Sequence, residues 1–217
     1  MVKRSYSGSS YSVAKKSRSM VKYVPRRPSY KPETKSVIRT DTQTMYGGGI
    51  YSHYFTLLNG LALGAEADQR IGRKVRMASV EFDLAFKLGG TVTEYDNGFW
   101  SLIYDKRPNG VTPILTDVFL PSGGYGTVIL NETLHPGRFI ELSRGNWNVG
   151  IAKSWVQTVH RKVSLGNKLV EFRDSSASIT GIDSGAVFLV YGAADSGTIL
   201  ADGTKVNIVT KIKYVDL

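Results

Sequence analysis

The sequence contains no cysteine among its 217 residues. It therefore has no disulfide framework, no thiolate metal site and no thiol nucleophile. Zinc fingers and zinc knuckles, which are common in basic nucleic-acid-binding proteins, are thereby excluded. Long apolar runs are missing too: residues 186–191 form a strand-sized run, whereas a membrane-spanning helix needs about 20 apolar residues. The basic start lacks the apolar stretch of a secretory signal. We therefore expect neither a membrane segment nor a signal peptide.

Histidine is scarce, and the sequence lacks the spacings that enzymes use. His53, His135 and His160 lie far apart and form no His-x-His or His-Glu-x-x-His pattern. There is no P-loop and no Gly-x-Ser-x-Gly motif. Glu81 and Asp83 share one face of an expected strand, where they could flank a glycosidic bond or bind Ca²⁺ between subunits. A solvated face is the simpler interpretation. We expect no enzyme activity, no metal site and no cofactor.

Acidic residues are nearly absent from the first forty residues, which contain only Glu33. This stretch has a net charge of +10, eleven cations minus one acid, and that equals the net charge of the whole chain. From residue 41 to 217, 17 cations balance 17 acids. The segment also holds nine serines and three prolines and few large aliphatic residues, so it cannot bury enough apolar surface to offset its ordering entropy. We predict a flexible basic arm over residues 1–40 and a neutral domain over 41–217.

The arm has the composition of a polyanion-binding segment. Lysine and arginine neutralise phosphates, and the four interleaved tyrosines of the arm can stack on unpaired bases. Two short basic clusters also resemble nuclear-import signals. A solvated tail and an organelle transit peptide are the alternatives. The predicted nucleic-acid-binding residues are Lys3, Arg4, Lys15, Lys16, Arg18, Lys22, Arg26, Arg27, Lys31, Lys35 and Arg39. Secondary candidates for nucleic-acid or interface contacts are Arg70, Arg73, Lys74 and Arg76.

The sequence of the domain predicts an all-β structure. Residues 75–88 alternate apolar and polar side chains, which is typical of a strand with one buried face. Turn signals such as Asn59-Gly60 and Asp202-Gly203 separate the apolar runs. One short helix is expected at 113–119, started by proline. The expected strands are eight: residues 50–58, 75–88, 98–104, 138–149, 154–164, 168–173, 186–191 and 206–214. This pattern predicts an antiparallel sandwich or barrel.

Residues 99–119 carry a more specific pattern. An apolar strand is followed by Asp105, a Pro-x-Gly turn at 108–110 and a short helix that ends in Asp-aliphatic-Phe. This stretch resembles a segment of small plant-virus coat proteins, including those of geminiviruses. Residues 59–64 and 69–75 resemble the turn that enters the second barrel strand in coat proteins of satellite necrosis viruses and of small circular single-stranded DNA viruses. Weaker matches lie at 138–140 and 185–189.

The resemblance implies an eight-stranded antiparallel jelly-roll sandwich that assembles into an icosahedral shell of 60 copies. The basic arm would then face packaged single-stranded nucleic acid, with circular DNA favoured over RNA, and the protein would reside in the virion and the host nucleus. The chain departs from geminivirus coat proteins because it is shorter and lacks cysteine. The coat protein of a satellite RNA virus, a cellular nucleic-acid-binding module and a jelly-roll enzyme or lectin remain open as alternatives.

Overall fold

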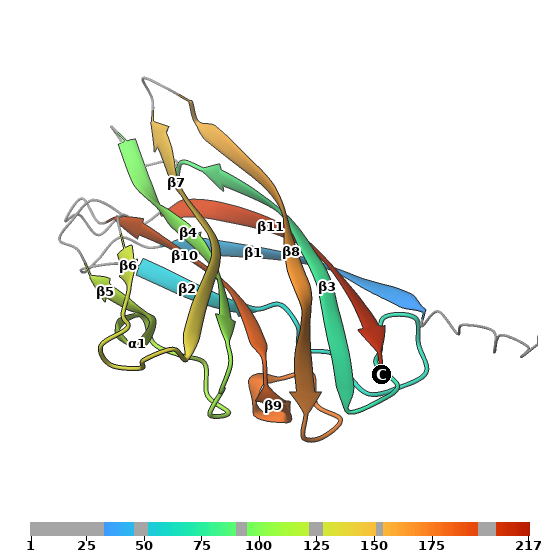
Figure 1. The fold of residues 1–217 in the computed structure, drawn as a ribbon. Coiled ribbons are helices and arrows are strands. Elements are labelled where there is room, and N and C mark those ends of the chain that lie inside the picture. Colours follow the sequence, from blue (N-terminus) through green and yellow to red (C-terminus); the bar gives the residue numbers. More distant parts are fainter. Residues whose placement is uncertain (1–32, 46–51, 90–94, 122–127, 151–153, 195–202) are drawn as a thin grey trace, which may run out of the picture. The chain divides into compact units, whose positions relative to one another are not determined.

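The computed structural model describes residues 33–45, 52–89, 95–121, 128–150, 154–194 and 203–217. All of them belong to one compact unit, Pro32–Leu217. In these ranges most of the chain forms strands, with one short α-helix and one 3₁₀ turn (Figure 1). The helix is α1 (Leu115–Val118) and the turn is η1 (Ile179–Gly181). The strands are β1 (Thr34–Met45), β2 (Ser52–Leu57), β3 (Lys74–Lys87), β4 (Tyr95–Asp105), β5 (Phe119–Pro121), β6 (Val128–Leu130), β7 (Phe139–Gly150), β8 (Val156–Phe172), β9 (Ile182–Ser184), β10 (Ala186–Ala194) and β11 (Thr204–Asp216).

The long strands form two antiparallel sheets. One sheet has the order β1-β11-β3-β8-β9, and the other has the order β2-β10-β4-β7. Without the three-residue strands β5, β6 and β9, eight strands remain. Numbered along the chain, they are ordered first-eighth-third-sixth in one sheet and second-seventh-fourth-fifth in the other. This is the strand order of a jelly roll, which confirms the predicted fold class.

The number of predicted strands is right, but two of the predicted boundaries are wrong. The strands expected at 154–164 and 168–173 are one continuous strand, β8, which stays paired with β3 across a bulge. Gly166 and Asn167 both have positive φ at this bulge, 57° and 56°. By composition the Gly-Asn pair predicts a turn between two strands. In the structure it forms a bulge within β8, and the strand continues on both sides of it. The first strand of the jelly roll, β1, was missed.

β1 corrects the C-terminal end of the predicted arm. Thr34–Met45 pairs with β11 at twelve register positions, and Val37 is buried against the core. Residues 34–40 therefore belong to the sheet and not to the arm. Their sequence is mostly polar because β1 is an edge strand with an exposed outer face. The flexibility predicted for the preceding residues concerns positions 1–32, which lie outside the described residues.

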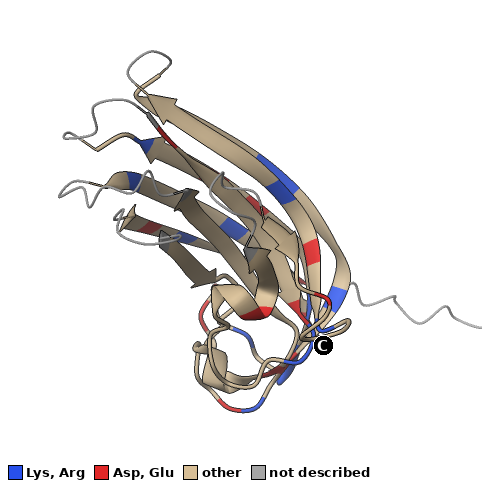
Figure 2. Cartoon of the chain, turned by 90° about the vertical axis from the view of Figure 1, so that its left-hand side faces the viewer, with Lys and Arg blue, Asp and Glu red and all other residues tan. Residues whose placement is uncertain are grey.

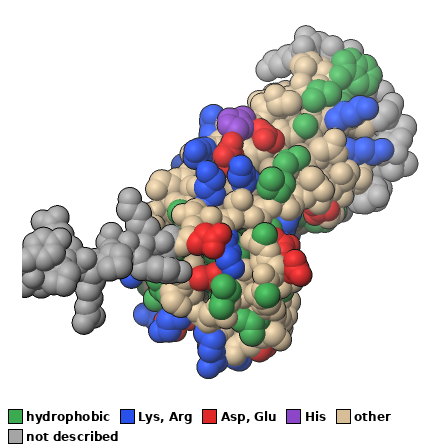
Figure 3. Space-filling view, turned by 90° about the vertical axis from the view of Figure 1, so that its right-hand side faces the viewer, with side chains coloured by type: hydrophobic (Ala, Val, Ile, Leu, Met, Phe, Trp, Pro, Cys, Tyr) green, Lys and Arg blue, Asp and Glu red, His purple; other side chains and the backbone are tan. Residues whose placement is uncertain are grey.

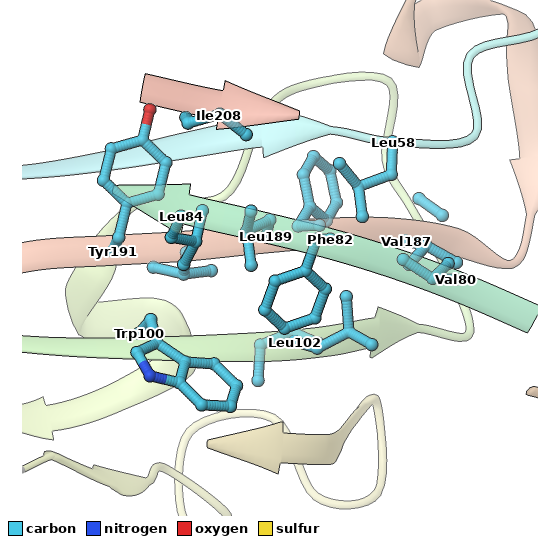
Figure 4. Close-up of a cluster of buried hydrophobic side chains, with 14 of the residues drawn as sticks. Leu58, Val80, Phe82, Leu84, Trp100, Leu102, Val187, Leu189, Tyr191 and Ile208 are labelled. Atoms are coloured by element: carbon cyan, nitrogen blue, oxygen red, sulfur yellow. The ribbon is translucent and has the colours of Figure 1, made fainter. Parts of the chain in front are cut away.

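The core lies between the two sheets, and aromatic rings join them (Figure 4). Phe82 of β3 meets Trp100 of β4 edge to face at 5.3 Å between ring centroids. Phe86 stacks on Trp147 of β7 at 4.6 Å. Aromatic pairs of this kind contribute more than their buried area alone. They fix how the first sheet packs on the second.

Each of these tryptophans lies over a glycine of the neighbouring strand. Trp147 is paired in register with Gly98, and Trp100 with Gly145. A Cβ atom at either glycine would lie 2.6 Å from the Cζ2 atom of the opposite indole. The two glycines therefore provide the space that two bulky rings need within one layer of the core.

An ion pair closes the end of the second sheet. Asp105, the acid of the motif at 99–119, is fully buried at the end of β4. Its carboxylate accepts hydrogen bonds from Arg138 Nε and Nη2 at 3.0 and 2.8 Å, and from the backbone N–H of Arg107 at 3.0 Å. A bidentate pair is a strong, directional contact. It ties the turn after β4 to the start of β7.

We predict that Trp147→Ala lowers the free energy of unfolding by about 3–5 kcal/mol, because it removes the ring that stacks on Phe86 and leaves a cavity over Gly98. Trp155→Ala is the control, since that side chain is 51% exposed; its effect should stay within about 0.5 kcal/mol. Urea unfolding of both variants measures the difference. If Trp147→Ala proved as stable as Trp155→Ala, the packing of the two sheets would not depend on this contact.

We also predict that residues 33–217 unfold cooperatively at the same urea concentration as the full chain. Residues 41–217 lack residues 34–40, which make up more than half of β1 and include the buried Val37, so they should be less stable by about 2 kcal/mol or more. Their β11 edge would also be open to aggregation. Near-ultraviolet circular dichroism and urea titration of both fragments measure this. A molten 33–217 fragment would mean that the fold depends on the arm.

Candidate nucleic-acid interface

Most of the predicted arm cations lie outside the described residues. Nine of the eleven belong to this group: Lys3, Arg4, Lys15, Lys16, Arg18, Lys22, Arg26, Arg27 and Lys31. Residues 1–32 contain these nine cations and no acid. Residues 33–217 contain 19 cations and 18 acids, a net charge of +1. The role of the nine cations stays a prediction, and the separation of charge along the chain is a property of the sequence itself.

The two described arm cations contact the domain's own backbone. The Lys35 ammonium donates to the carbonyl oxygen of Gln69 at 2.9 Å and lies 3.0 Å from the Asp216 carboxylate. The Arg39 guanidinium donates to the carbonyl oxygens of Leu57 and Gly60. Burial lowers the pKa of Arg39, and the charge of Asp68 opposes that shift. Both side chains tie β1 to the rest of the sandwich, so the structure gives them a structural role.

Arg70 is a structural residue as well. Its side chain is only 1% exposed, and its guanidinium donates to the carbonyl oxygens of Leu61, Gly72 and Asp174. The guanidinium carbon lies 4.1 Å above the centre of the Phe172 ring. Burial lowers the pKa of Arg70 against the raising effect of the nearby acids. In this fold Arg70 is not accessible to a nucleic acid.

The other three secondary candidates are exposed at the start of β3. Arg73 donates to the backbone carbonyl oxygens of Phe172 and Arg173, and Lys74 pairs with Glu171 at 2.7 Å. Arg76 has no ion-pair partner among the described residues. Lys74 and Arg76 alternate with the buried Val75 and Met77, so they point away from the core. They lie on the outer face of the first sheet.

The same outer face carries five further lysines that the sequence reasoning missed. We define this face by the side chains of β1, β11, β3 and β8 that point away from the core. Its register places Lys205 opposite Lys87, and Lys211 opposite Glu81, which is in turn opposite Lys162. None of the five lysines has a carboxylate within ion-pair distance among the described residues. The lysines are Lys87, Lys162, Lys205, Lys211 and Lys213.

Two acids of this face, Glu81 and Asp83, lie on β3, and a third, Glu171, lies near the end of β8 and pairs with Lys74. The Oδ1 atom of Asp83 lies 2.6 Å from Nδ1 of His160 on β8. In the register of the sheet, Glu81 lies between Lys162 of β8 and Lys211 of β11. Figure 3 shows blue side chains around a histidine and the red acids beside it. Figure 2 shows Lys and Arg residues at several positions along the long strands. The interpretation of Glu81 and Asp83 as a solvated, charged face agrees with this placement.

The described ranges contain no group of three His, Asp or Glu side chains that could hold a metal ion. The three histidines lie on β2, before β7 and on β8. No helix in the described part of the chain is long and apolar enough to cross a bilayer. The expected absence of enzyme activity and cofactors stays a prediction.

The chain matches no protein-family model and no curated protein. Among solved structures, it resembles one of Desmodium yellow mottle tymovirus, with 11% identity, coverage of 90% of this chain and 95% of that chain, and a TM-score of 0.40. It also resembles the decameric BFDV capsid protein, with 13% identity, coverage of 86% and 100%, and a TM-score of 0.39. For an Israeli acute paralysis virus particle the identity is 9%, the coverage 98% and 83%, and the TM-score 0.36. TM-scores of this size do not establish a shared family.

We predict that Arg70→Met lowers the free energy of unfolding by about 3–5 kcal/mol, because three backbone carbonyl oxygens, one of them in a buried contact, lose their donor. Arg76→Met, on the exposed outer face, should change it by no more than about 0.5 kcal/mol. Urea titration and oligonucleotide binding are measured for both variants. If Arg70→Met keeps its stability but loses binding, Arg70 is a binding residue after all.

Proposed function

We propose that the protein is a viral capsid protein that assembles into a closed icosahedral shell and packages single-stranded nucleic acid through its basic arm. The observation that carries this proposal is the separation of charge: nine cations and no acid in residues 1–32, joined to a nearly neutral body. A neutral body does not repel its own copies, whereas a cationic segment neutralises phosphates.

The jelly-roll topology supports this proposal. Jelly rolls occur in viral capsids, lectins and cupins. A cupin needs clustered metal ligands, and the described residues contain no such cluster. The motif at 99–119, which resembles coat-protein sequences, includes the buried Asp105 and therefore contributes to this fold.

The number of arm cations in a shell is comparable to the number of phosphates in a small genome. Sixty copies would bring about 540 arm cations, nine from each chain, enough to neutralise a useful fraction of the phosphates of a strand of one or two kilobases. We favour circular single-stranded DNA over RNA on the sequence resemblance alone. The arm's basic clusters suit import into the host nucleus, and the finished protein would reside in the virion.

The test compares the parent with a variant in which Lys15, Lys16, Arg18, Arg26 and Arg27 are replaced by Ala, so that four of the nine arm cations remain. We expect the parent to form closed, uniform particles with single-stranded DNA in electron micrographs and to protect that DNA from nuclease. The variant should keep its fold and protect several-fold less nucleic acid, because fewer phosphates are neutralised. Its binding should also depend less steeply on salt.

The outcomes separate the alternatives. A parent that binds DNA but stays monomeric under every salt and pH tested is a nucleic-acid-binding module and not a capsid protein. A variant that protects as much DNA as the parent shows that the arm does not hold the genome. Nuclease typing of nucleic acid that copurifies with the parent distinguishes DNA from RNA.

A further inference from the structure

One half of the outer face combines cations with hydroxyl groups and contains no acid. The outward-facing positions of β11 carry Lys205, Lys211 and Lys213. Two of the paired outward-facing positions of β1 carry hydroxyl side chains, with Ser36 opposite Lys213 and Thr44 opposite Lys205, whereas the exposed Ile38 lies opposite Lys211. We call this half the β1–β11 track and define it by Ser36, Thr40, Thr42, Thr44, Lys205, Lys211 and Lys213.

The acids of the outer face lie beside the track and not within it. Glu81 and Asp83 belong to β3, on the far side of β11 from β1. The outward-facing positions of β1 and β11 include no Asp or Glu in the described residues. A polyanion that follows β11 on the side of β1 therefore meets the three lysines without crossing Glu81 and Asp83. The exposed acid of β1, Asp41, occupies an inward-facing register position opposite Ile208.

The side chains of the track match the chemistry of a phosphate backbone. Lysine ammonium groups and serine or threonine hydroxyls are common donors to phosphate oxygens. Lys205 and Lys213 are eight residues apart on one strand, a length of about 27 Å, so the track can contact several successive phosphates. No aromatic side chain occupies an outward-facing position of β1 or β11. The track can hold a backbone, but it offers no ring on which bases can stack.

The track also continues the basic arm along the chain. β1 begins at Thr34, three residues after Lys31, the last of the nine arm cations. The first outward-facing residues of β1 lie beside Lys213, since Ser36 is paired with it in register. Along the sequence, Glu33 is the only charged residue between Lys31 and the start of β1, so the track follows the arm closely in the chain.

We propose that the β1–β11 track is a second binding surface for the backbone of single-stranded nucleic acid, independent of base sequence. This inference rests on the proposed function, because it takes nucleic acid as the partner. It assigns binding to lysines of the folded body in addition to those of the arm.

The experiment measures the binding of a fluorescent thirty-nucleotide oligo-dT to the full chain across a salt series. The test variant carries Lys205→Gln, Lys211→Gln and Lys213→Gln. The matched control carries Lys106→Gln, Arg107→Gln and Arg173→Gln, three exposed cations outside the track. A charge-preserving variant, with Lys→Arg at the three track positions, separates loss of charge from any loss of fold. Each variant is also made with the five arm substitutions to Ala.

The track variant should lower the slope of log affinity against log salt by about 2, because each phosphate contact of a single strand contributes about 0.7. The control should lose less than a third of that, and the Lys→Arg variant should bind like the parent. With the arm neutralised, the track variant should lose most of the remaining binding.

Three results would overturn the inference. The track variant could match the parent, the control could lose as much as the track variant, or the track variant could lose heparin binding while it keeps oligo-dT binding. The last result would assign the track to an acidic glycan. Failure of the proposed function looks different, because then the unaltered full chain shows no salt-dependent binding of oligo-dT at all.

Discussion

The packing of two tryptophans between the sheets is the contact on which the rest of the fold depends. Trp100 and Trp147 each cover a glycine of the adjacent strand and meet Phe82 and Phe86 of the opposite sheet. Because protein interiors are close-packed, these rings determine how far apart the sheets lie and in which register β4 meets β7.

The apolar core also restricts the positions that charged side chains can occupy. Most inward-facing positions of the sheets are filled by apolar side chains, and the cations at inward-facing positions of β1 are Lys35 and Arg39. Lys35, Arg39 and the buried Arg70 donate to backbone carbonyl oxygens. The lysines of β11 and β3 project outward and keep their charge in solvent. The same residue type therefore stabilises the fold in one place and is available to a ligand in another.

The jelly-roll topology creates a surface that chain order does not suggest. β11 lies between β1 and β3, so the last strand of the chain brings its lysines next to the hydroxyl groups of the first. Residues 33–217 are nearly neutral in total charge, yet this strand order places Glu81 and Asp83 on the β3 side of β11 and no outward-facing acid on its β1 side. A small net charge thus coexists with a face that suits a polyanion.

Period-two alternation in the sequence determined the all-β class, the buried face of β3 and the strand at 206–214, because strand periodicity is a local property. Composition likewise determined the position of the cationic segment, except for residues 34–40, which belong to β1. Only the tertiary structure decided that the polar residues 34–40 form an edge strand, since their partner β11 lies about 170 residues away. It alone showed that Gly166-Asn167 is a bulge and that Arg70 is buried. Pairing partners and burial depend on contacts distant in sequence, which local patterns do not record.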